Sequence, residues 1–186
     1  MPNWCNNTIT ISGQTETIKN LWEEATAEDG GLLSAMVPMP KELEGTTSPS
    51  PEGQTKVVDG YTNWYDWSVS RWGTKWDVST EGLEFKDNGD GTAEITGWFD
   101  SAWAPPLGAY EKFCDDMDGV YLEAYYDETG MVFCGYWSNE GGDDYYEYGE
   151  ATSETIRDIV PDYLVDEFAL DERLAEWEEM EMEMED

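Results

Sequence analysis

The fold is set by the opening of the chain, which reads NNTITISG at residues 6–13. Ile9 and Ile11 alternate with polar residues, which is typical of a β-strand with one buried face, and Gly13 ends the pattern. A helix is expected next, with Thr15 as its N-cap. The apolar residues of this helix recur at helical spacing and are Ile18, Leu21, Trp22 and Ala25.

The rest of residues 1–150 continues with strands and helices after an insertion at about residues 32–75. Two hairpins are predicted, because strand-forming runs flank turn sequences such as DNGDG at residues 87–91. Pro105 and Pro106 open a helix between the hairpins. The expected strands cover residues 77–85, 92–99, 120–126 and 131–137, with a short edge strand at residues 145–148. This order predicts an α+β fold, a ferredoxin-like antiparallel sheet with helices on one face.

Residues 151–186 differ in composition from the rest, because they hold 14 acidic residues and two arginines, a net charge of −12. Apolar side chains recur at helical spacing on both sides of Pro161, which predicts two short helices. From Glu179 to Asp186, acidic residues and methionines alternate with a two-residue spacing that fits no helix face, so this end is expected to fray. The segment is interpreted as an acidic helical tail.

The composition indicates a folded protein with an extreme negative charge. Of 186 residues, 39% are hydrophobic and 14% aromatic, and disordered acidic chains are poor in such side chains. Asp and Glu number 43 against nine Lys and Arg, so the net charge is −34, whereas small domains usually carry about 2–8 charges of one sign. Two explanations stay open: solubility or a high-salt habitat, and complementarity to a basic partner. Direct binding to nucleic acid or to anionic membranes is disfavoured by charge repulsion.

Two features bear on location. No apolar run reaches the roughly 18 residues of a transmembrane helix, and the start MPNWC lacks the basic and apolar regions of a signal peptide. Cys5, Cys114 and Cys134 are odd in number and widely spaced, which argues against a disulfide framework. The cytoplasm is therefore the expected location.

Histidine and the common catalytic motifs are missing from the sequence. The chain has no histidine, which removes the commonest metal ligand and general base, and it has no CxxC, Walker A or GxGxxG motif. The DNGDG turn resembles a calcium loop in composition only, because Lys86 stands where an EF-hand needs a carboxylate. The pairs Asp115-Asp116 and Asp143-Asp144 suit Mg²⁺, but 43 acidic residues make chance neighbours common. No catalytic residue, metal ligand or cofactor is therefore predicted.

Acidic residues concentrate in residues 113–156, which contain twelve Asp and Glu and no Lys or Arg. On a strand, alternate carboxylates lie about 6.6 Å apart on one face, a spacing comparable to that of neighbouring phosphates in one DNA strand. Such a row imitates DNA, or forms a less specific acidic docking surface, or is only a solvated sheet face. Tyr145, Tyr146 and Tyr148 beside it suit a protein interface. The predicted partner-binding residues are Asp127, Glu128, Asp143, Asp144, Glu147 and Glu150, followed in the tail by Glu178, Glu179, Glu181 and Glu183.

Three segments together resemble the Api92-like family: MPNWCNNTITISG at residues 1–13, WGTKWD at residues 72–77 and FDSAWAPP at residues 99–106. The resemblance ends near residue 140, and it implies a ferredoxin-like domain and an origin in bacteriophages or plasmids. It implies no reaction and no catalytic residue. The acidic tail lies outside the resemblance and is interpreted as an addition of this chain. Within the second segment, Lys75 is expected to lie over an indole ring, and Asp77 to cap a helix or pair with Lys75.

The functional hypothesis follows from the charge together with this resemblance. We expect a phage-type acidic accessory protein that binds and inhibits or redirects a host nucleic-acid-handling or defence protein, with DNA mimicry as its specific form. The partner is then a basic, nucleic-acid-binding host protein, and the location is the host cytoplasm. The alternatives are a carboxylate enzyme with a divalent metal and a structural or assembly component of a phage.

Overall fold

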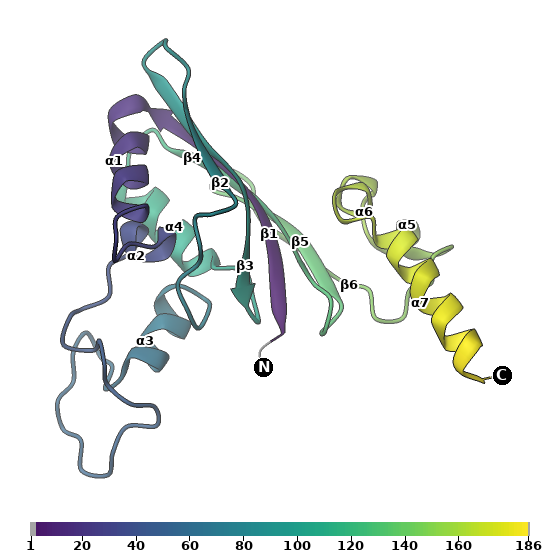
Figure 1. The fold of residues 1–186 in the computed structure, drawn as a ribbon, viewed down its shortest axis with the longest axis horizontal. Helices are drawn as coiled ribbons and strands as arrows, with labels where there is room; N and C mark the ends of the chain where they lie inside the picture. The colour runs from purple at the N-terminus through teal and green to yellow at the C-terminus, as the bar shows by residue number, and fades with distance from the viewer. Residues whose placement is uncertain (1–2, 186) are drawn as a thin grey trace.

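The computed structural model describes residues 3–185 and contains a six-stranded antiparallel sheet in the order β2-β3-β1-β4-β5-β6 (Figure 1). Met1 and Pro2 of the opening family segment, and Asp186 of the tail end, lie outside the described residues. The strands are β1 (Trp4–Gln14), β2 (Leu83–Asp87), β3 (Thr92–Ala102), β4 (Tyr121–Glu128), β5 (Phe133–Ser138) and β6 (Gly142–Glu147). The helices are α1 (Thr15–Ala25), α2 (Leu32–Met36), α3 (Trp64–Arg71), α4 (Leu107–Asp116), α5 (Ile156–Ile159), α6 (Asp162–Phe168) and α7 (Leu170–Glu185).

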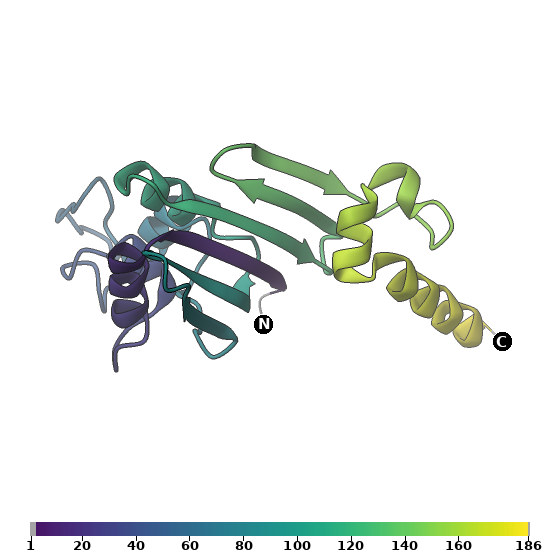
Figure 2. The ribbon, with the colours of Figure 1, turned by 90° about the horizontal axis from the view of Figure 1, so that it is seen from above.

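The first four strands form a ferredoxin-like unit. Apart from the insertion that holds α2 and α3, the chain runs β1-α1-β2-β3-α4-β4, and the sheet order of these strands is β4-β1-β3-β2. This is the split βαβ arrangement, so the predicted α+β, ferredoxin-like fold is confirmed. The hairpin of β5 and β6 extends the sheet beyond β4, as Figure 2 shows from above.

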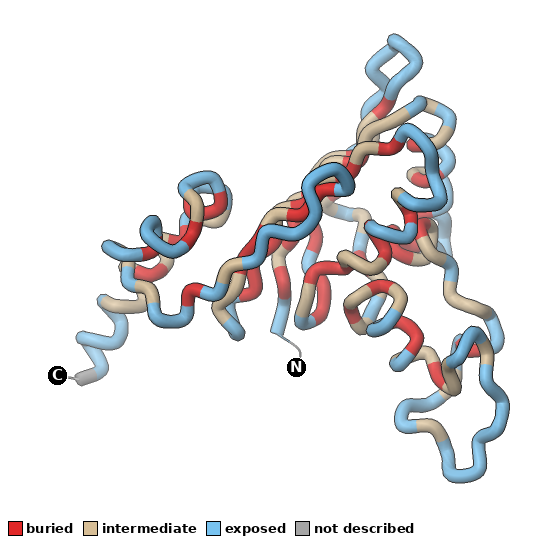
Figure 3. Tube along the Cα trace, turned by 180° about the vertical axis from the view of Figure 1, so that it is seen from behind, coloured by how far each residue is buried: buried red, intermediate tan, exposed pale blue. Residues whose placement is uncertain are grey.

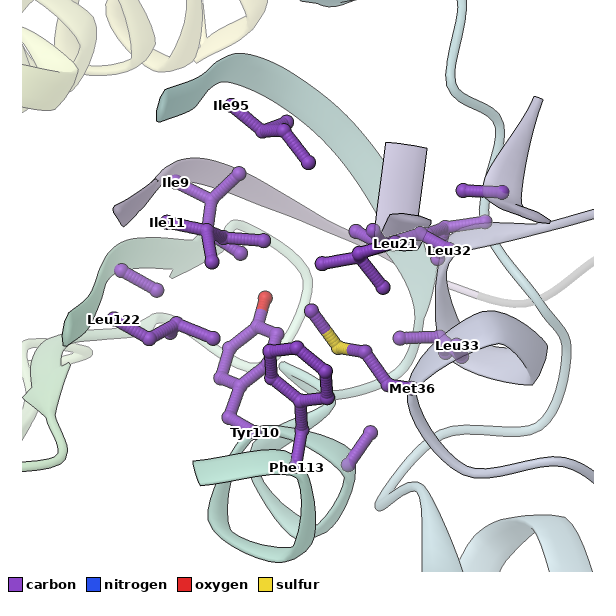
Figure 4. Packing of buried hydrophobic residues seen from close by; sticks show 14 of the residues in the cluster. Ile9, Ile11, Leu21, Leu32, Leu33, Met36, Ile95, Tyr110, Phe113 and Leu122 are labelled. Carbon is purple, nitrogen blue, oxygen red and sulfur yellow. The ribbon is translucent and has the colours of Figure 1, made fainter. Parts of the chain in front are cut away.

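The main core lies between the sheet and the helices α1, α2 and α4, which occupy one face as predicted. Burial is concentrated in the sheet and in the helix sides that face it (Figure 3). Ile9 and Ile11 of β1 are 1% and 0% exposed, and Figure 4 shows them on the same side of the sheet as Tyr110 and Phe113 of α4. Burying one such side chain contributes about 1.5–3 kcal/mol, so this contact is a main source of stability.

The predicted N-cap of α1 is wrong by one residue. Gln14 is the N-cap and makes no side-chain capping bond, while Thr15 is the first helical residue. The Thr15 N–H donates instead to the carbonyl of Gly91 at 3.0 Å. Because β1 runs without a loop into α1, the neighbouring strand end satisfies this N–H, and a capping side chain is not needed.

Asp77 caps α2 and is not part of a strand, although residues 77–85 are predicted as one. Its carboxylate accepts hydrogen bonds from the backbone N–H groups of Leu33 at 2.8 Å and Ser34 at 3.0 Å, so the expected helix cap is confirmed. A Cβ at Gly31 would lie 2.3 Å from the Asp77 carboxylate, so the glycine leaves it room. The strand β2 begins only at Leu83.

The tail helices α5–α7 cover the opposite face of the sheet, over β4 and β5 (Figures 1 and 2). Strand alternation places Tyr125, Cys134 and Tyr136 on this face, where they pack against a second buried cluster. The tail residues of this cluster are Ile156, Val160, Leu164, Val165, Leu170 and Leu174. The molecule therefore has helices on both faces, those of the ferredoxin-like unit on one and those of the tail on the other.

The prediction that the chain frays from Glu179 onward is wrong, because α7 continues as a helix to Glu185. Leu170 and Leu174 are buried and anchor its first half. The alternating Glu and Met residues that follow are good helix formers, so the helix continues without a buried face. Met180 and Met182 in this distal half are 52% and 63% exposed.

Candidate protein-binding surface

A buried ion pair fastens the tail to the sheet. Arg173 of α7 donates hydrogen bonds to both carboxylate oxygens of Asp127, at 2.7 and 3.1 Å, and one to the Tyr148 hydroxyl at 2.7 Å. The Tyr148 hydroxyl in turn donates to Asp127 at 2.6 Å. Asp127 is only 2% exposed, so its prediction as a partner contact is wrong. Asp127 can be buried because Arg173 neutralises its charge and because Arg173 and Tyr148 both donate hydrogen bonds to its carboxylate.

Glu128 is also internal, with 0% exposure, so its prediction as a partner contact is wrong as well. Its carboxylate accepts hydrogen bonds from the backbone N–H groups of Gly130 and Met131. These contacts hold the turn that joins β4 to β5. Asp127 and Glu128 are neighbours on a strand and point to opposite faces, so each is enclosed by a different layer of the molecule.

The acidic residues of β6 and the loop after it are exposed: Asp143, Asp144, Glu147 and Glu150. The strand is the outer edge of the sheet. Its register places Asp143, Tyr145 and Glu147 on the α4 face and Asp144 on the tail face. Asp143 and Glu147 are therefore separated by a tyrosine on their own face. The strand therefore does not carry an unbroken row of carboxylates on one face, which imitation of a DNA phosphate row would require.

The helix α7 does carry such a row. Glu172, Glu176, Glu179 and Glu183 recur at intervals of four, three and four residues, and all four are exposed. This spacing places them on one side of the helix, and we call them the α7 stripe. Glu181 is exposed outside the stripe.

Glu178 is half-buried, and it serves the tail itself. It accepts hydrogen bonds from the backbone N–H and the hydroxyl of Ser153, both at 2.8 Å. These bonds lower the pKa of its carboxyl. Glu178 therefore ties the middle of α7 to the segment that precedes α5, so its carboxylate is already engaged within the chain.

Both arginines of the tail are engaged in internal contacts. Arg157 contacts three carboxylates, those of Asp162 at 3.1 Å and of Asp166 and Asp171 at 2.8 Å each, and so links α5, α6 and α7. Hydrogen bonds to these carboxylates raise the pKa of Arg157, and the guanidinium lowers the pKa of Asp171. With Arg173 paired to Asp127, the described part of the tail presents no unpaired arginine to a partner.

The three family segments meet at one end of the sheet in a cluster of exposed indoles. Trp4, Trp76 and Trp103 are 50%, 39% and 39% exposed, and the rings of Trp4 and Trp76 lie 6.2 Å apart. The Lys75 ammonium lies 4.3 Å from the centre of the Trp76 ring and 5.1 Å from that of Trp103, so the expected position over an indole is confirmed. Exposed tryptophans on this scale are typical of interfaces.

Neither a metal-binding group nor a membrane-spanning helix is present among the described residues. Over the described residues, no group of three or more Cys, Asp and Glu side chains is arranged to hold a metal ion. Within residues 3–185, no helix combines the length and the apolar character that a bilayer crossing requires.

The fold and the surface together define an α+β protein with a ferredoxin-like unit, an acidic edge strand and an acidic helical tail. Residues 72–181 match the family model described as "Ferredoxin-like domain in Api92-like protein", and the chain belongs to this family. The match includes most of the tail, so the interpretation of the tail as an addition of this chain is wrong. A crystal structure of protein Api92 from Yersinia pseudotuberculosis is similar over 80% of this chain and 99% of that chain, with 12% sequence identity and a TM-score of 0.48. No curated protein matches the sequence.

Proposed function

We propose that this protein is an acidic docking protein that binds a basic surface of another protein. The supporting observation is that most of its few cations are neutralised internally. Within residues 3–185, six of the nine Lys and Arg residues form ion pairs with carboxylates of the same chain. These six are Lys19, Arg71, Lys86, Lys112, Arg157 and Arg173. The carboxylates of β6 and the α7 stripe stay exposed, so the molecule offers a nearly uniform negative field to a cationic partner.

The partner in this proposal is a nucleic-acid-binding protein, and the α7 stripe is the part that imitates DNA. Residues three or four apart on a helix have Cβ atoms about 5–6 Å apart, close to the step between neighbouring phosphates of one strand. From Glu172 to Glu183 the stripe extends about 16 Å, given a rise of ~1.5 Å per residue. Basic groups that normally follow a phosphate row then have a row of carboxylates to follow.

In its fullest form, the proposal is that the protein acts in a host cell as a phage-type accessory protein. It would there inhibit or redirect a nucleic-acid-handling or defence protein by occupying its basic surface. The family membership supports the fold, and the charge supports the mode of binding. The enzyme and phage-assembly hypotheses stay predictions, because no particular feature of the described residues favours either one.

The experiment is a pull-down from host lysate at low and at high salt, with and without competing DNA duplex. Capture of a nucleic-acid-binding protein that salt and duplex both release is the expected result. A variant with Glu172, Glu176, Glu179 and Glu183 all changed to Gln should lose this capture. The matched control removes the same charge from exposed positions of the α1 region, with Glu16, Glu24 and Glu28 changed to Gln and Asp29 to Asn, and should retain it. Capture that ignores salt and duplex contradicts the proposal.

A further inference from the structure

A small aromatic pocket lies beside the acidic edge strand. It has a volume of about 310 Å³ and is formed where the segment between β3 and α4 meets strands β4, β5 and β6. Four of its walls are the rings of Trp103, Tyr126, Phe133 and Tyr145, and its one charged lining group is the carboxylate of Asp143. A pocket of ~300 Å³ is at the small end of ligand sites, which suits one side chain better than a whole small molecule.

The position of the Asp143 carboxylate is fixed by a residue on a neighbouring strand. Tyr126, which is 1% exposed, donates its hydroxyl hydrogen to Asp143 Oδ1 at 2.6 Å. Gly135 of β5 pairs with Tyr126 on one side and with Tyr145 of β6 on the other, and a Cβ there would sit 2.2 Å from the Tyr126 hydroxyl oxygen. The glycine therefore lets the phenol cross β5 and hold the carboxylate. Asp143 Oδ2 accepts no hydrogen bond from the described residues, which leaves it available to a ligand.

The wall opposite β6 is held in an unusual backbone conformation. Trp103 has a φ of 71°, a left-handed value that a bulky residue rarely adopts, and its N–H donates to the Asn3 carbonyl at 3.0 Å. Residues in such conformations concentrate at functional sites. The Trp103 ring already lies 5.1 Å from the Lys75 ammonium, which lies closer, at 4.3 Å, to Trp76. The aromatic surface of this region therefore accommodates a cation.

The electrostatics of the pocket favour a cation from outside. Burial raises the pKa of the Asp143 carboxyl, with a smaller rise from the neighbouring Asp144, while the Tyr126 hydrogen bond lowers it. Partial burial means that water stabilises this carboxylate less well than an open one. Among the described residues that line the pocket none is cationic, so no internal ion pair meets this charge.

We propose that this pocket seats the guanidinium group of an arginine side chain from the basic partner. The proposal rests on the proposed function, because it assigns one residue type of that partner to one site. A guanidinium is planar, so it stacks on aromatic rings while its N–H groups donate to a carboxylate. A lysine ammonium is a strongly hydrated point charge that cannot stack in this way. Arginine should therefore bind more tightly than lysine at equal charge.

The test uses two synthetic ten-residue peptides, in which five arginines or five lysines alternate with serine, titrated into the full chain by calorimetry at low salt. The arginine peptide should bind more tightly. Asp143→Asn should weaken its binding about tenfold, the loss expected for one charge-assisted hydrogen bond. Asp144→Asn removes the same charge one residue away on the opposite face, and should weaken it much less. Tyr145→Ala, at a position that is 49% exposed, should also reduce the preference for arginine.

The outcomes separate the pocket from the general docking surface. Equal losses in Asp143→Asn and Asp144→Asn, or equal binding of the two peptides, would overturn the arginine pocket and leave the proposed function standing. If neither peptide binds the unaltered protein at low salt, the proposed function itself fails. Circular dichroism of each variant shows whether it is folded. If Asp143→Asn does not fold, Tyr145→Ala decides the test in its place.

Discussion

Arg173 and Asp127 are 46 residues apart in the sequence, yet they form a bidentate ion pair, with N–O distances of 2.7 and 3.1 Å, that joins the tail to the sheet. The pair is enclosed by Tyr148, and the Arg173 guanidinium also lies 5.5 Å from the Trp177 ring. This contact explains how a segment with a net charge of −12 stays against a sheet that is itself acidic. The tail is fixed by apolar burial and by its two arginines, and the carboxylates of the α7 stripe stay exposed.

Breaking this pair should destabilise the protein and release the tail. Asp127→Asn leaves the Arg173 charge without its counterion, and losing one partner of a buried pair costs about 3–5 kcal/mol. Because the Arg173 side chain keeps 22% exposure, the lower end, about 3 kcal/mol, is expected. Urea unfolding measures the loss, and hydrogen exchange should rise in α5–α7. Asp158→Asn, an exposed tail variant with the same charge change, is the control and should be neutral.

The cap of α2 provides a second stability test. Asp77→Ala removes the carboxylate that accepts from Leu33 and Ser34, and losing such a cap costs about 0.5–2 kcal/mol. Gly31→Ala should destabilise the protein by a similar amount, because its Cβ would lie 2.3 Å from the Asp77 carboxylate and would displace the cap instead of removing it. Thermal unfolding of both variants checks this. If the double variant is no worse than either single one, the two residues act through the same contact.

The sequence predicts the periodic parts of this fold and misses the contacts between distant residues. Alternation in β1 and the apolar spacing in α1 are local patterns, and both elements are observed near their predicted bounds. Asp127 and Glu128 were predicted at the surface because charged residues are rarely buried without partners. The partner of Asp127 is Arg173, and no local pattern connects them. The pocket around Asp143 was missed for the same reason, because its walls come from three separate parts of the chain.

The net charge should make the stability of the protein depend strongly on salt. Forty-three acidic residues against nine basic ones repel one another in the folded state, and added salt screens this repulsion. Raising the ionic strength from about 0.01 to 0.15 M shortens the Debye length from ~30 to ~8 Å. A gain of at least about 1 kcal/mol is expected, which corresponds to a rise in Tm of about 2–4 °C for this size. A Tm that does not change with NaCl would contradict it.

Arginine binding should weaken on acidification at a higher pH than it would if Asp143 titrated as an ordinary aspartate. Burial raises the pKa of Asp143 above 3.8, so as pH falls this carboxylate is protonated early and loses its attraction for a cation. The effect of pH on the stability of the free protein is the opposite of its effect on binding. The folded state holds the proton of Asp143 more tightly than the unfolded state does, so the free energy of unfolding decreases as pH rises through the raised pKa. Peptide titrations at several pH values should show this early loss in the unaltered protein and in Asp144→Asn. They should not show it in Asp143→Asn.

Gly135 should prove necessary for the preference for arginine although it does not line the pocket. In Gly135→Ala the new Cβ would lie 2.2 Å from the Tyr126 hydroxyl oxygen and 2.6 Å from the Asp144 carbonyl oxygen, so the phenol must move and release Asp143. Overpacking of this kind costs about 1–3 kcal/mol, which leaves room for a folded variant with a disordered pocket. The variant should lose the preference for the arginine peptide while it keeps weak, salt-sensitive binding of both peptides. Gly149→Ala meets only Val132 at 3.4 Å and is the matched control, with the preference intact. A folded Gly135→Ala that still prefers arginine would show that the preference does not depend on Tyr126 holding the Asp143 carboxylate.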